Sequence, residues 1–299
     1  MSDPADEGEN GSEQPCWDGL FTRINGLPLL QRTRLLLELI ADDIPEPSSK
    51  LAEPTLLMAL LAQRAKSLYA NFQHSLGSPP EIGPLIVVRP LGELVILTKW
   101  LTLDLDLHPF LYFADSEGAE VSHLNAVRAH ARDRGTAVPE DPNDPTARKE
   151  AVRDAALARL RALNKNYGKD RITPNLRRMA DEVIGRVPGH KLVMNDAYVY
   201  AYKTFSGWEH SDAGSFKATA EESSPGEWRW IGDRSPWAAD IVEVIGSAFY
   251  AYILETAFAT LGNAQSAGIA RGVRDQLMDE FGHPPASEPD MSDREAPEE

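Results

Sequence analysis

Apolar residues recur at helical spacing along most of the chain. The segment "LLQRTRLLLELIADDI" at residues 29–44 repeats apolar positions every three or four residues and is followed by the helix-breaking "PEPSS". Pro54 opens a second such segment, which Gly77 and two prolines terminate. One stripe of that segment consists of Leu57, Leu61, Ala65, Leu68 and Phe72. The pattern predicts two amphipathic helices in the first quarter of the chain.

The same period predicts further helices as far as the last few turns of the chain. Pro90 is expected to bend one of them or mark its start, and Thr173 with Pro174 is expected to cap another. The residues between 108 and 135 fit either one helix or a broken pair. A third segment shows a seam closed by Gly168, made of Val152, Ala156, Leu160, Leu163 and Tyr167. The further predicted helices span about 85–103, 108–135, 146–168, 174–185, 190–208 and 237–262, and a last one ends near Gly282.

Only one region has a pattern typical of strands. The segment "SFKATAEESSPGEWRWIG" contains two short runs around a Ser-Pro-Gly turn and predicts a small β-hairpin. Eight or nine helices with mostly short connections predict an all-α fold, a single-domain helical bundle over residues 16–282. The tails at 1–15 and 283–299 are acidic and poor in large apolar groups, so we expect them to be disordered.

Composition narrows the class of protein. The 299 residues are 42% hydrophobic, which is ample for a sizeable core. Cys16 is the only cysteine, and no basic region precedes an apolar run at the N-terminus, so we expect a cytoplasmic protein. The charge-free run between Glu243 and Glu255 has eleven residues, short of the roughly 18 that a membrane span needs. The sequence thus predicts a core helix there and no membrane association.

Charge is distributed unevenly along the chain. The net charge is −16, of which each tail contributes −5. Residues 147–186 hold eleven basic and five acidic residues and are therefore basic by six charges. Two interpretations stay open for this segment: a solvated helix face, or a site for phosphate or another anion. Its candidate anion-binding residues are Arg153, Arg159, Arg161 and Lys165.

Two charged residues interrupt the most apolar segment of the N-terminal half. Arg89 and Glu93 lie within "LIVVRPLGELVIL", where an unpaired charge would be costly. They are four residues apart and share a helix face, so they could pair. Since the order Arg before Glu suits the helix dipole poorly, we expect at least one of them to contact a partner on another helix.

The expected partner segment is "YVYAYKTFSGWEHSD". Tyr202, Ser206 and His210 are spaced by four residues and would align on one helix face. A histidine bonded to a carboxylate there could act as general acid or base, and Arg89 could hold an anion. The alternative is a buried polar network that only fixes helix register.

The two segments together carry a resemblance. The order and spacing of "RPLGELVILTKWL" and "YAYKTFSGWEHSD" resemble a bacterial all-helical family of unknown function, over about residues 50–262. That resemblance implies a fold and a candidate pocket of Arg89, Glu93, Ser206 and His210, but no reaction. More distantly, the chain is similar to the HEPN superfamily of helical nucleases, which cleave RNA without metal through an Arg and a following His. It departs from that pattern, because Ser206 occupies the position four residues before His210.

Two functional hypotheses follow. The first is a HEPN-like RNA-cleaving toxin or defence protein with RNA or another anion as partner; the second is a non-catalytic binding or scaffold protein. No phosphate-binding loop or dinucleotide motif occurs, so we expect no nucleotide cofactor. The Glu-x-x-His pairs at Glu120 and Glu280 match di-iron spacing, but His283 adjoins two prolines, and we expect no metal. The other histidines, including His108 and His190, stand alone in the sequence.

Overall fold

The described structure is mainly helical, as the apolar period predicts. It is a computed structural model that describes residues 26–48, 52–76, 83–136, 144–168, 171–199, 220–224, 227–230 and 239–281. The predicted disordered tails lie outside these residues. Within them there are nine α-helices and one 3-10 turn, which confirms the all-α class. The α-helices are α2 (Leu29–Ala41), α3 (Glu53–Ser75), α4 (Gly83–Thr102), α5 (His108–Asp133), α6 (Thr146–Ala162), α7 (Leu176–Arg186), α8 (Lys191–Asp196), α11 (Ala239–Leu261) and α12 (Ala264–Phe281).

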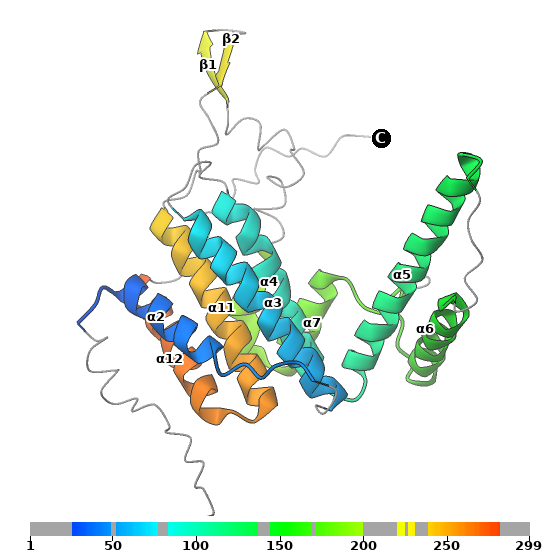
Figure 1. Ribbon diagram of the computed structural model, residues 1–299. Helices are drawn as coiled ribbons and strands as arrows, with labels where there is room; N and C mark the ends of the chain where they lie inside the picture. The colour runs from blue at the N-terminus through cyan, green and yellow to red at the C-terminus, as the bar shows by residue number, and fades with distance from the viewer. Residues whose placement is uncertain are drawn as a thin grey trace, which may run out of the picture.

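The centre of the fold is α11, which packs against α2, α3, α4 and α12 (Figure 1). Its buried residues include Phe249, Ile253 and Phe258, and the core continues onto α3 and α4. All members of the predicted α3 stripe are buried except Leu68, which is partly buried. Helix α7 packs against α4, while α5 and α6 pair beside the main bundle (Figure 1).

Membrane association has little support from this arrangement. Of the helices in the described ranges, only α11 is long and apolar enough to cross a membrane, over Asp240–Leu261. In its apolar window 83% of the residues are buried against the neighbouring helices. A buried core helix has the same length and composition as a membrane span, so the feature is weak evidence for a membrane.

Helix α6 ends earlier than the sequence pattern predicts. The prediction closed it at Gly168, but it ends at Ala162, and Asn164 adopts the left-handed conformation with φ of 51°. The Lys165 N–H donates to the Leu160 carbonyl at 2.9 Å, which completes a Schellman cap with Asn in the usual glycine position. Because the helix stops here, Leu163 is 49% exposed and does not extend the buried seam.

Other predicted boundaries shift by local chemistry. Helix α7 is capped by Asn175, whose side chain accepts from the Arg178 N–H at 2.9 Å, so Thr173 and Pro174 precede the cap. Pro90 lies inside α4 and does not begin it, and α5 is one continuous helix.

The strand-like region contains two paired strands. β1 (Ala220–Ser224) and β2 (Glu227–Trp230) run antiparallel, with an irregularity between Glu222 and Ser224. They lie apart from the helices in Figure 1.

Candidate functional site

The candidate site forms where α11 turns back into α12. Gly262 has φ of +80°, a left-handed conformation that glycine adopts without a Cβ penalty. The Asn263 N–H donates to the Phe258 carbonyl at 2.9 Å and ends α11 in a Schellman cap. The Asn263 side chain then accepts from the Ser266 N–H at 3.0 Å, which starts α12. This two-residue connection makes the helices antiparallel neighbours and brings their side chains together.

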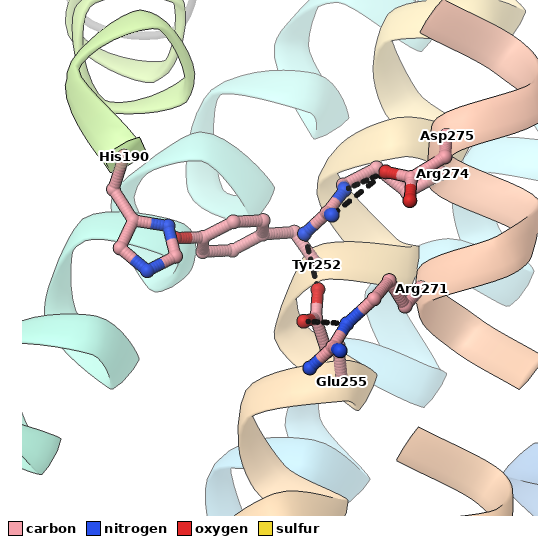
Figure 2. Close-up of polar contacts among 6 residues, drawn as sticks. All are labelled: His190, Tyr252, Glu255, Arg271, Arg274 and Asp275. Carbon is pink, nitrogen blue, oxygen red and sulfur yellow. Dashed lines mark hydrogen bonds and ion pairs between the residues drawn. The ribbon is translucent and has the colours of Figure 1, made fainter. Parts of the chain in front are cut away.

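A buried carboxylate lies at the centre of this contact. Glu255 is 7% exposed, and its Oε1 accepts from the Arg271 Nε at 2.8 Å. Its other oxygen pairs with Arg274, whose guanidinium also contacts Asp275 at 2.7 Å (Figure 2). Arg271 and Arg274 share one face of α12 because they are three residues apart. A buried carboxylate needs such partners, since unpaired burial of a charge is costly.

The ring of Tyr252 contacts two cations. It lies three residues before Glu255 on α11, and the Arg274 guanidinium lies over its ring, 5.5 Å from the centroid. The Lys99 ammonium of α4 lies 5.6 Å from the same centroid. Cation–π contacts of this distance are favourable, more so where water is excluded. We call Lys99, His190, Tyr252, Glu255, Arg271 and Arg274 the Glu255 cluster.

The Glu255 cluster has more positive than negative charge. Lys99, Arg271 and Arg274 face Glu255, and Asp275 adds one further, exposed carboxylate. Burial lowers the pKa of the Lys99 ammonium, an effect that Glu255 opposes and the charges of Arg274 and Arg271 reinforce. No carboxylate in the described part of the chain forms an ion pair with Lys99. The arrangement is electrostatically suited to an anion.

His190 completes the cluster from the segment after α7. Its Nδ1 is hydrogen-bonded to the Tyr252 hydroxyl, and the two rings meet edge to face at 5.5 Å between centroids (Figure 2). Burial, with a smaller contribution from the Lys99 charge, lowers the pKa of His190 to about 4. Burial also raises the pKa of Tyr252 well above its usual range. At neutral pH the imidazole is therefore a neutral, weak base and the phenol a very weak acid, which suits binding better than proton transfer.

The predicted site is described only in part. Arg89 and Glu93 form an ion pair along α4, with the Arg89 Nε 3.0 Å from the Glu93 carboxylate. The side chains are 15% and 37% exposed. The expected partners Tyr202, Ser206 and His210 lie outside the described residues, so the contact across the bundle stays a prediction.

The four candidate anion-binding residues are spread around their segment. Arg153 packs against Gly118 of α5, and Arg159 lies over the Phe110 ring at 5.5 Å. Arg161 is exposed, and Lys165 follows the end of α6. At 100° per residue, the three arginines point in different directions around α6 and do not share a face.

The residues with the spacing of metal ligands make other contacts in the structure. Glu120 pairs with Lys149 of α6, which also contacts Glu117 at 2.5 Å. His283 lies outside the described residues. Among those that are described, no three His, Cys, Asp or Glu side chains gather as a metal site would require.

No residue of the Glu255 cluster was predicted from the sequence to belong to a site. Glu255 was expected only to end an apolar run, and His190 to be an isolated histidine. The available pattern was a carboxylate inside a core helix, followed by two arginines three residues apart on the next helix. Since burial within a helix demands a partner for the charge, that pattern could have indicated the α11–α12 cluster.

No known family model matches the chain, and no curated protein or solved structure was found to match it. The resemblances stated from the sequence therefore stay predictions.

Proposed function

We propose that this is a binding protein for a phosphate-class anion and that the Glu255 cluster is its binding site. The observation that carries the proposal is Lys99, an ammonium held over the Tyr252 ring beside two arginines without an ion-paired carboxylate in the described structure. A bound anion would neutralise the excess positive charge of the cluster. Arg271 is 60% exposed at its side chain, so one cation of the cluster is accessible from solvent.

The pKa directions favour binding over catalysis. A histidine with a pKa of about 4 is a poor general base at neutral pH, and a tyrosine with a raised pKa is a poor acid. The non-catalytic hypothesis from the sequence therefore has the better support at this site.

The test compares Lys99→Met with Lys66→Met. Lys66 is a matched control, because it is a partly buried lysine on α3 that pairs with Asp42 away from the cluster. Inorganic phosphate and a short RNA oligonucleotide are each titrated into the protein by calorimetry. We expect both to bind the wild type and K66M, and to bind K99M at least about tenfold more weakly. K99M should also keep or raise the melting temperature, because it removes a desolvated cation from among other cations. Equal affinity of K99M and wild type, or no anion binding at all, would overturn the proposal.

Metal-independent RNA cleavage is a second candidate. It is favoured by Arg89, whose side chain is 15% exposed and is positioned by Glu93 on its own helix. A ribonuclease assay with fluorogenic RNA in the presence of a metal chelator tests it, with H210A as the variant. We expect cleavage by wild type and its loss in H210A; no cleavage by wild type contradicts this candidate without bearing on anion binding.

A further inference from the structure

A separate pocket lies between α2, α3 and α11. Its volume is about 480 Å³, within the roughly 300–1,000 Å³ typical of small-molecule sites. Apolar lining comes from Leu35, Leu39 and Ala70, while Tyr69 and Tyr250 contribute aromatic rings. It shares no lining residue with the Glu255 cluster, although α11 contributes to both.

Two stacked tyrosines on the lining differ in their hydrogen bonding. The rings of Tyr69 and Tyr250 lie 4.3 Å apart at 21°. The Tyr69 hydroxyl is bonded to the Ser247 hydroxyl at 2.9 Å. The Tyr250 hydroxyl is buried, with the residue 1% exposed, and has no hydrogen-bond partner in the described part of the chain. An unsatisfied buried hydroxyl is unfavourable, so a tyrosine instead of a phenylalanine here indicates a missing polar partner.

The rim of the pocket is acidic. Asp42 pairs with Lys66 at 2.8 Å, and the same ammonium contacts the Ala41 carbonyl. Glu38 is exposed and has no ion pair among the described residues. Burial raises the pKa of Tyr250, and Tyr69, Asp42 and Glu38 raise it further, which is consistent with a hydroxyl near the two rim carboxylates.

We infer that this pocket binds a small organic amine, with its apolar body against the tyrosine-lined wall and its ammonium at Glu38. The apolar lining supplies the contact for the body. Glu38, the rim carboxylate that is not paired with Lys66, supplies the negative charge for the ammonium. The faces of aromatic rings also attract cations that can reach them. The Tyr250 hydroxyl supplies a hydrogen bond to the polar end of the ligand.

Calorimetry with the full chain tests this inference. The probes are phenethylamine, tryptamine and hexylamine, with 2-phenylethanol as the neutral isostere and 3-phenylpropionate as the anionic one. We expect at least one amine to bind at micromolar to millimolar concentration, and the two isosteres to bind at least about tenfold more weakly.

Three variants separate the contributions. Tyr250→Phe should weaken amine binding by about tenfold while the melting temperature rises, because the unpaired hydroxyl is removed. Glu38→Gln should weaken it similarly, whereas Glu53→Gln, at the exposed start of α3, should leave it unchanged. Failure of all three amines, equal binding of amine and alcohol, or unchanged affinity in Y250F would overturn the inference. Since K99M does not touch this pocket, the result is independent of the anion-binding proposal.

Discussion

The two halves of α11 solve opposite packing problems. In its first half Gly246 faces Phe72 of α3 so closely that a Cβ would lie 2.5 Å from the ring. In its second half Glu255 is surrounded by the charges of α12. The first contact depends on shape and excludes added volume, whereas the second depends on charge balance. One buried helix thus carries a tight apolar interface and a polar cluster within three turns.

The largest expected effect is at the tight interface. Gly246→Leu should lower the free energy of unfolding by about 3 kcal/mol, because Phe72 is fully buried and cannot move away without disturbing the core. Urea unfolding measures the change. Gly268→Leu on α12 is the matched control, because no atom of the described residues outside its own helix backbone lies within 4 Å of the position that a Cβ on Gly268 would take. Similar destabilisation by both variants would contradict a difference in packing.

Removing the central charge of the polar half should have the next largest effect. Glu255→Ala leaves Arg274, 16% exposed at its side chain, without its buried partner. Breaking a buried pair costs about 3–5 kcal/mol, but Asp275 still contacts Arg274, so we expect about 2 kcal/mol in urea unfolding.

Arg271→Gln serves as the comparison for that variant. Arg271 is mostly exposed, so its loss should cost less than about 1 kcal/mol. If R271Q were as destabilising as E255A, the exposed cation and not the buried carboxylate would determine the stability of the cluster.

The periodicity of the sequence predicted the apolar contact between α3 and α11 better than the charged contact between α11 and α12. The stripe of Leu57, Leu61 and Phe72 follows from helical spacing, because apolar burial depends on position within one helix. The residues of the Glu255 cluster come from four segments, namely α4, the 3-10 turn before α8, α11 and α12, and no local pattern specifies which helices meet. The Arg89–Glu93 pair was predictable because both residues lie four apart on α4.

Boundaries were harder to predict where two residues could end a helix. At α6 both Asn164 and Gly168 could adopt a left-handed conformation, and both do so, with φ of 51° and 123°. The helix ended at the first of them, where the Asn164 N–H donates to the Arg161 carbonyl at 3.0 Å and the Lys165 N–H donates to the Leu160 carbonyl at 2.9 Å. The predicted end at Gly168 was therefore wrong, because α6 ends six residues earlier, at Ala162.

A smaller effect is expected from the hydrogen bond beside the tight interface. Tyr69→Phe removes the bond to Ser247, which is 1% exposed, and should cost about 1 kcal/mol. Combining it with Ser247→Ala should recover part of that loss, because neither hydroxyl of this pair is then left behind without its partner. Thermal unfolding of both single variants and the double variant measures the coupling, and strict additivity would contradict it.

The smallest expected effect is the contribution of His190 to the pH dependence of stability, and it tests the polar cluster on the second half of α11. The pKa of His190 is about 4 in the folded protein, against about 6.5 for an ordinary histidine, because the imidazole is partly buried and lies near Lys99. Between these values the unfolded chain binds a proton that the folded chain does not, so stability is full above pH 6.5 and falls as pH drops toward 4.

His190→Asn isolates this contribution by difference from wild type. The full linkage is not expected, because the imidazole is only partly buried and solvent screens its charge; we expect less than about 1 kcal/mol. Burial lowers the pKa of His108 too, but that residue is present in both proteins and cancels in the comparison. Thermal unfolding from pH 7 to pH 4.5 should therefore show a shallower loss of stability in H190N. Identical pH profiles would mean that burial and the neighbouring Lys99 do not lower the pKa of His190 in the folded protein.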